Sequence, residues 1–197
     1  MRDPELRVAV IVASTREARI APTIVEWFLA EKVAIDGIEV DLIDLTEVDL
    51  PPYQAAKPAF MGDYDSQAIR DFGARIDRAD AFVIITPEYN HGYPASLKHA
   101  LDSVYHEWKG KPVGFISYGG ISGGVRAIEQ LRGVMAELHT VTIRNHVSFP
   151  MVRSCFDEDG RAVNQDVVSD AATTMMTELL WWAGALRDAR SQSAFPV

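Results

Sequence analysis

The segment from Ala13 to Arg19 places two hydroxyl groups and two guanidinium groups just before a stretch with the composition of a helix. The free N–H groups and the positive dipole end of a helix N-terminus favour a bound anion. Ser14, Arg16 and Arg19 are therefore candidate phosphate ligands. The alternative is that a hydroxyl only caps the turn and both arginines are solvated. The segment lacks the glycines and the GK[ST] ending of a triphosphate-binding loop, so a triphosphate is disfavoured.

Two further segments have unusual compositions. Pro87 to Pro94 combines prolines and aromatic side chains with a glycine, a composition that can present backbone amides and apolar surface to a flat ring. Tyr118 to Gly124 is rich in glycine, which lets the backbone approach a ligand closely. Taken alone, each segment is equally typical of an ordinary loop between a strand and a helix that binds no ligand. The glycine spacing is not G-x-G-x-x-G, so an independent dinucleotide site is disfavoured.

The hydrophobic pattern predicts five strands that alternate with five helices. The strands are expected at residues 6–13, 38–44, 81–86, 113–117 and 141–147. The helices are expected at about residues 22–32, after Ser66, and at about 95–107, 125–138 and 166–187. This alternation indicates an α/β fold with a doubly wound, open parallel sheet covered on both faces. No linker divides the chain, so residues 1–197 are predicted to form a single domain.

The predicted sheet brings the three segments to one edge. In open parallel sheets, ligands bind outside the carboxyl ends of the strands, where the strand order reverses. In the order 2-1-3-4-5 this point lies between the first and third strands. The three segments follow the first, third and fourth predicted strands, so we expect them to surround one ligand.

Composition excludes several classes of protein. The chain has 197 residues, of which 48% are hydrophobic and 24% charged, which is typical of a globular protein. Its net charge of −9 disfavours nucleic acid as a partner. The single cysteine, Cys155, indicates a reducing cytoplasm and no metal site built on thiolates. Residues 1–5 lack the apolar stretch of a signal peptide, and no segment reaches membrane-spanning length.

Together the three segments resemble the NADPH-dependent FMN reductase family, which includes NAD(P)H quinone reductases and azoreductases of flavodoxin-like fold. The resemblance covers about residues 6–150 and is most specific at Pro87 to Pro94, continuing through residues 97–102, 111–112 and 117–120. It implies a five-stranded flavodoxin-like sheet of order 2-1-3-4-5. It also implies an enzyme that uses bound FMN to pass hydride from NAD(P)H to quinones, free flavin, azo compounds or similar small acceptors.

The resemblance also implies which residues bind the cofactor. Ser14, Arg16 and neighbouring amides hold the phosphate. The ring is lined by Pro87, Glu88, Tyr89 and Asn90 and closed on its other side by Ser117, Tyr118, Gly119 and Gly120. Arg19 occupies a position where the family often has serine, so it either replaces that serine as a phosphate ligand or points to solvent. Ala13 replaces the usual glycine, and Ala21 replaces an asparagine.

No catalytic side chain and no metal are expected, because a flavin carries the hydride itself. Cys155 is expected to be inert, and His99 and His106 are expected to be surface residues of one helix. The resemblance also favours a homodimer, or a dimer of dimers, whose subunits meet near the flavin. The tail after Met151 carries no family signal.

Two functions other than catalysis stay open. One is an electron carrier of the flavodoxin type, for which an acidic surface would help docking to a basic partner. In carriers of this type the phosphate loop contains no arginine, and the motif from Asn90 to Pro94 is absent. They therefore fit this sequence less well. The other is a redox-gated interaction protein without turnover of its own.

Overall fold

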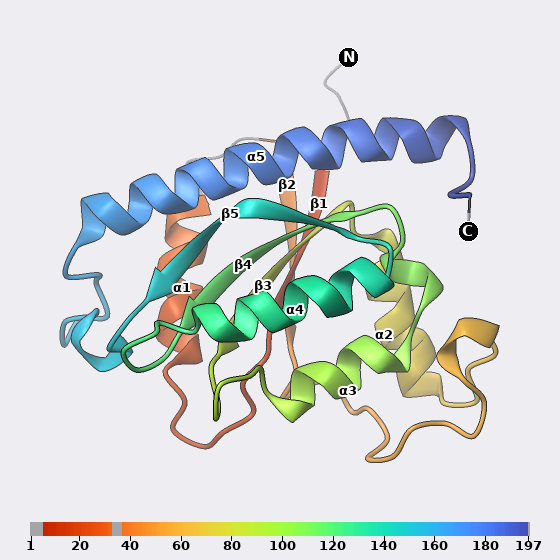
Figure 1. Ribbon diagram of the computed structural model, residues 1–197, viewed down its shortest axis with the longest axis horizontal. Coiled ribbons are helices and arrows are strands. Elements are labelled where there is room, and N and C mark those ends of the chain that lie inside the picture. Colours follow the sequence, from red (N-terminus) through yellow and green to blue (C-terminus); the bar gives the residue numbers. More distant parts are fainter. Residues whose placement is uncertain (1–5, 33–36, 197) are drawn as a thin grey trace.

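The computed structural model describes residues 6–32 and 37–196 (Figure 1). Residues 1–5, on which the expectation of no signal peptide rests, lie outside the described residues. One parallel sheet has the strand order β2-β1-β3-β4-β5, so the predicted order is confirmed. The strands are β1 Leu6–Val12, β2 Ile38–Asp44, β3 Ala81–Pro87, β4 Pro112–Tyr118 and β5 Val141–Phe149. The helices are α1 Ala21–Lys32, α2 Gln67–Arg78, α3 Ala95–Ser103, α4 Val125–Glu137 and α5 Gln165–Gln192.

The helices cover both faces of the sheet. Side chains of α1 and α5 share one apolar core with Val8, Val10 and Val12 of β1. Side chains of α2, α3 and α4 share the other core with Ala9 and Ile11 of the same strand. Every residue of β3 and β4 is buried, as expected for strands with helices on both faces. Figure 1 shows α5 crossing one face of the sheet, with α4 and α3 on the other. No helix within the described ranges is long and apolar enough to cross a membrane.

The helix after Pro94 is shorter than predicted, and this corrects the expected range of 95–107. It ends at Ser103, because Val104 takes an extended conformation, and a separate 3-10 turn follows at His106–Trp108. The break lets the fully buried Trp108 ring pack on Phe82, with ring centroids 4.9 Å apart. Trp108 Nε1 then donates a hydrogen bond to the Val104 carbonyl at 3.0 Å.

His99 and His106 therefore do not share one helix, which corrects a second expectation. Each ring instead contacts the long loop from Pro51 to Tyr64. His99 Nε2 is 2.7 Å from the Pro51 carbonyl oxygen, and His106 Nε2 is 2.7 Å from that of Phe60. The two histidines anchor the loop to α3 and to the turn after it.

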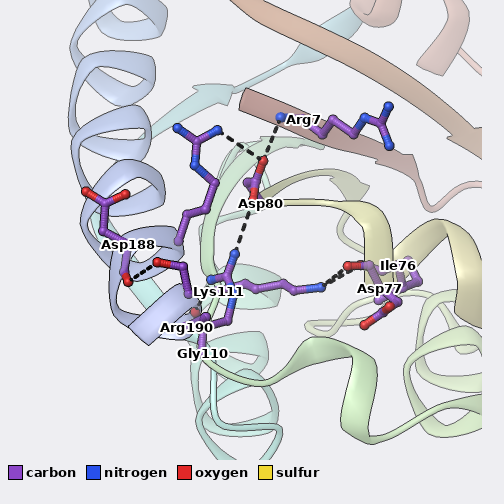
Figure 2. A network of polar contacts seen from close by, with 10 residues as sticks. Arg7, Ile76, Asp77, Asp80, Gly110, Lys111, Asp188 and Arg190 are labelled. Atoms are coloured by element: carbon purple, nitrogen blue, oxygen red, sulfur yellow. Dashed lines mark hydrogen bonds and ion pairs between the residues drawn. The ribbon is translucent and has the colours of Figure 1, made fainter. Parts of the chain in front are cut away.

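The last helix continues to Gln192, past the expected end near Arg187, and its end is tied to the amino-terminal edge of the sheet (Figure 2). Arg190 donates a hydrogen bond to the Gly110 carbonyl at 2.5 Å and pairs with Asp80 at 3.2 Å. Asp80 also accepts the backbone N–H of Arg7 at 3.0 Å. The two contacts of Arg190 favour a longer helix, since Arg190 lies beyond the expected end.

Lys111 is a buried cation in this network. Its side chain precedes β4, and its Nζ donates to the carbonyls of Ile76 and Asp77 at 2.9 and 2.7 Å (Figure 2). Both carbonyls belong to the last turn of α2, where helix carbonyls lack partners within the helix. Burial lowers the pKa of Lys111 to about 8, from an ordinary value of 10.5. The Arg190 charge acts in the same direction.

We predict that the wild-type protein gains stability relative to a Lys111→Met variant as the pH rises from about 8 to 10.5. In this window the unfolded lysine still holds a proton that the folded one has released, so the free energy of unfolding rises with pH. A difference of one pKa unit corresponds to about 1.4 kcal/mol, so the gain should be about 3 kcal/mol. Urea unfolding of both proteins at several pH values measures it. A stability difference that is constant across this window would contradict the prediction.

Candidate functional site

A cavity of about 480 Å³ opens at the carboxyl edge of the sheet, between β1 and β3. This volume lies within the usual range for small-molecule sites. All three predicted loops line it, together with the segment after β5. The lining residues are Ser14, Arg16, Ala18, Arg19, Ile20, Thr23, Pro87, Glu88, Tyr89, Tyr118, Gly119, Val152 and Arg153. Three residues predicted from sequence, Asn90, Ser117 and Gly120, are not among them.

The loop after β1 presents a hydroxyl and a guanidinium group to the cavity. Ser14 is buried, and its hydroxyl is 2.8 Å from that of Tyr89, so these two loops are directly bonded. The Arg16 guanidinium lies 5.7 Å from the centroid of the Tyr89 ring. Arg16 forms no ion pair with any residue that the structure describes, so its charge is available to an anion. The cavity also reaches Thr23 in the first turn of α1, a helix whose N-terminus adds a favourable dipole.

Arg19 lines the same cavity, but its guanidinium is held by Asp44 at the end of β2. Two parallel hydrogen bonds of 2.7 and 2.5 Å join the two side chains. Arg19 also donates to the Ser14 carbonyl at 2.5 Å. Burial alone would raise the pKa of Asp44, but hydrogen bonds from Arg19 and Thr46 lower it below its ordinary value. Arg19 therefore braces the loop against β2, an arrangement that neither sequence-based alternative anticipated.

Tyr118 places a buried hydroxyl at the cavity. Its side chain is 5% exposed, and within the described part of the chain its hydroxyl makes no hydrogen bond of good geometry, although it lies close enough to the Ser14 hydroxyl to interact with it. Burial raises the pKa of this phenol, so the hydroxyl is neutral and can donate. A buried donor of this kind costs free energy unless it meets an acceptor. Because Tyr118 lines the cavity, an acceptor group of a ligand would satisfy it.

The Glu88 carboxylate bonds to neighbouring side chains of the protein. Its side chain is 5% exposed, pairs with Arg126 of α4 and accepts a hydrogen bond from Ser122 at 2.8 Å. Burial would raise the pKa of Glu88, but the Arg126 and Ser122 hydrogen bonds lower it. The carboxylate is thus an ion that fixes the glycine turn after β4.

The turn from Tyr89 to Gly92 has an uncommon backbone. Asn90 and His91 have φ values of +50° and +75°, and the N–H and carbonyl groups of Tyr89 and Gly92 bond to each other at 2.8 and 3.1 Å. Positive φ at both central residues is typical of a type I′ turn. Gln130 of α4 donates to the His91 carbonyl at 2.8 Å, so neighbouring structure supports the strained residue.

Ser117 lies beneath the glycine turn and not in the cavity wall. It is fully buried, and its hydroxyl donates to the Gly123 carbonyl at 2.8 Å. Gly123 and Gly124 have positive φ, and a Cβ at Gly123 would lie 2.3 Å from Ser148 Oγ. These two glycines are needed for packing. Gly119 lies in the cavity wall, and no atom would lie within 4 Å of a Cβ built at Gly120.

Sequence reasoning missed the contribution of the chain after β5. The backbone N–H groups of Met151 and Val152 donate to the carbonyls of Gly120 and Gly119 at 2.8 and 3.0 Å. These bonds place Val152 and Arg153 at the cavity. No local pattern could have revealed this, because the contact depends on hydrogen bonds between segments that are far apart in the sequence.

Other reactive side chains stay outside this site. Among residues 6–32 and 37–196, no three histidine, cysteine or acidic side chains are grouped so that they could hold a metal ion. Cys155 is a free thiol whose pKa is raised by burial, so it is mostly protonated at neutral pH. Its sulfur donates to the Pro150 carbonyl at 3.0 Å. Both features favour an inert cysteine.

Comparison with known proteins shows what this chain is similar to. The profile of the NADPH-dependent FMN reductase family matches residues 6–153. An NAD(P)H-dependent FMN reductase of Schizosaccharomyces pombe is 40% identical over 120 residues, which are 60% of this chain and 60% of that protein. A 2-hydroxy-1,4-benzoquinone reductase of a Burkholderia species is 30% identical over 94% of this chain and 98% of its own length. The chain thus spans less than two thirds of the fission yeast relative and nearly all of the Burkholderia one.

Solved structures show the same fold. FerB, a flavoenzyme NAD(P)H:(acceptor) oxidoreductase of Paracoccus denitrificans, superimposes with a TM-score of 0.70 at 23% identity, over 90% of this chain and 97% of that one. The expected flavodoxin-like fold is therefore confirmed, since flavoenzymes share this sheet and its covering helices.

The contacts of Arg19 generate a prediction about stability. Arg19→Ala should lower the free energy of unfolding by about 1–3 kcal/mol, because it leaves a half-buried carboxylate without its cation. Arg16→Ala is the matched control, since Arg16 bonds to no acidic group among the described residues, and it should change stability by less than about 0.5 kcal/mol. Urea unfolding without added ligand measures both variants. Equal stabilities of the two variants would contradict a bracing role for Arg19.

Proposed function

This chain belongs to the NADPH-dependent FMN reductase family, and from this premise we propose that it is an FMN-dependent NAD(P)H oxidoreductase that reduces small acceptors. The acceptors are quinones, free flavin, azo compounds or similar molecules. The observation that carries the proposal is the convergence of three predicted loops on one cavity at the strand carboxyl ends. Relatives named for the reduction of a benzoquinone and of azo compounds support the acceptor class.

The side chains of the cavity fit FMN. Ser14 and Arg16 lie in the loop that leads from β1 to α1 and would hold the phosphate, whose charge they complement. Pro87, Tyr89 and Gly119 would line the ring from two loops, with the Tyr118 hydroxyl supplying a donor. FMN bound here supplies a ring that accepts hydride from NAD(P)H and passes it to the acceptor.

The remaining predicted residues act on the shape of the site. Glu88 and Ser117 hold the glycine turn in place through Ser122 and Gly123, while Asn90 shapes the turn after β3. Arg19 would orient the phosphate loop through the Ser14 carbonyl. No side chain of the cavity needs to act as an acid or a nucleophile. The protein therefore contributes position, electrostatics and exclusion of water.

The proposal includes one FMN-binding domain over residues 1–197, a cytoplasmic location and a homodimer or dimer of dimers. A single free cysteine and an acidic net charge of −9 support a reducing compartment without nucleic-acid partners. Ile121 and Met151, which are 91% and 57% exposed, flank the glycine turn beside the cavity. Exposed apolar side chains at this edge support a second subunit that covers the flavin.

Steady-state kinetics test the proposed activity. FMN-loaded protein should oxidise NAD(P)H with a quinone acceptor and give parallel double-reciprocal lines, because nicotinamide and acceptor must occupy the same cavity in turn. Intersecting lines would contradict a shared site. Uptake of FMN with negligible NAD(P)H oxidation would instead identify an electron carrier.

Arg16→Ala should weaken FMN binding by about ten- to a hundredfold and leave riboflavin binding nearly unchanged, because a hydrogen bond to a charged group is worth about 1.5–3 kcal/mol. Arg16→Lys should recover only part of this loss, since an ammonium keeps the charge but lacks the planar fork. Titration of apoprotein with both flavins, followed by flavin fluorescence at fixed salt, measures the effect. Equal losses for both flavins would mean that Arg16 supports the loop instead of the phosphate.

A further inference from the structure

Three arginines line the cavity, and a fourth, Arg126, pairs with the lining residue Glu88; the protein neutralises the charges of two of the four. Arg19 is paired with Asp44, and Arg126 is paired with Glu88. Arg16 and Arg153 line the cavity and form no ion pair or hydrogen bond with the described residues. The cavity therefore carries two guanidinium charges without a partner, in a protein whose net charge is −9.

The backbone around Arg153 is held by hydrogen bonds to the glycine turn after β4. Arg153 lies in the 3-10 turn Val152–Ser154, directly after the two backbone hydrogen bonds to Gly119 and Gly120. The turn begins at Met151, which adopts a φ of +48°, an uncommon value for a residue with a side chain. Such a conformation persists only where the surrounding structure enforces it, and it is concentrated at functional sites.

The same segment also reaches the first turn of α1. A Cβ built at Gly160 would lie 3.6 Å from Cγ2 of Thr23, and Thr23 lines the cavity with Arg153. In Figure 1 the chain between β5 and α5 runs past the start of α1. The segment after β5 thus faces the helix N-terminus that the phosphate would approach.

We propose that Arg153 is a second phosphate ligand, which faces Arg16 across the cavity and binds the phosphate of FMN from the side opposite the loop after β1. This inference rests on the proposed function. A phosphate monoester carries close to two negative charges at neutral pH, and the cavity offers two uncompensated guanidinium groups. Arginine is suited to this task because its planar donors match phosphate oxygens.

A second observation supports a polar ligand here. The buried Tyr118 hydroxyl lines the cavity and makes no hydrogen bond of good geometry among the described residues, so it can donate to an acceptor group of a ligand. Arg153 and Tyr118 flank Gly119, whose backbone also lies in the wall. The chain after β5 therefore completes the site and does more than connect β5 to α5.

Arg153→Ala and Arg161→Ala form a matched pair of variants for the test. Both remove one exposed arginine from the chain between β5 and α5, but Arg161 pairs with Asp159 and lies outside this cavity. Apoprotein of each variant and of the wild type is titrated with FMN and with riboflavin, and flavin fluorescence is followed at two salt concentrations. Arg153→Ala should weaken FMN binding about tenfold and reduce its salt dependence, while riboflavin binding stays unchanged. Arg161→Ala should match the wild type.

Other outcomes overturn the inference in distinguishable ways. If Arg153→Ala binds FMN as tightly as Arg161→Ala, Arg153 does not touch the phosphate. If this variant instead raises KM for NADPH but not for NADH, the arginine binds the 2′-phosphate of the nucleotide. Equal losses for FMN and riboflavin would assign it a packing role. If the wild type binds neither flavin, the proposed function itself fails and the inference falls with it.

Discussion

The fold leaves only the ends of its central strands free to meet a ligand, and the site follows from this constraint. Both faces of β3 and β4 are covered by helices, so only the last residues of these strands, Pro87 and Tyr118, reach the cavity. The connections at the carboxyl ends supply most of the other lining residues. Hydrogen bonds between neighbouring connections then give the edge a definite shape, from Ser14 to Tyr89 and from Val152 to Gly119.

Electrostatics at this edge divide the arginines into two groups. Arg19 and Arg126 are paired with carboxylates and hold loops in place, whereas Arg16 and Arg153 line the cavity without a carboxylate partner among the described residues. This division explains how a protein with a net charge of −9 can attract a phosphate dianion. A local positive field is sufficient, because salt screens distant charges beyond about 8–10 Å.

Backbone strain is concentrated around the same edge. Ala18, Asn90, His91 and Met151 have positive φ values and lie in the segments that surround the cavity. Such conformations cost about 1–3 kcal/mol each and persist only where neighbouring contacts enforce them. The contacts are visible at His91, whose carbonyl accepts a hydrogen bond from Gln130, and at Met151, whose N–H donates to Gly120.

The sequence alone predicted the alternating strands and helices and the three loops of the site, because buried strands and ligand-binding loops leave local patterns in hydrophobicity and composition. The strand order followed from the family resemblance that these loops carry. Tertiary structure decided what local patterns cannot show. The pairing of Arg19 with Asp44 joins residues 25 positions apart across two strands, so its side chain braces the loop, a role that neither sequence-based alternative included. The buried Trp108 ended α3 at Ser103, although helical periodicity continued beyond it. Arg153 reached the cavity because the chain after β5 bonds to Gly119 and Gly120, a contact between distant segments that no local pattern encodes.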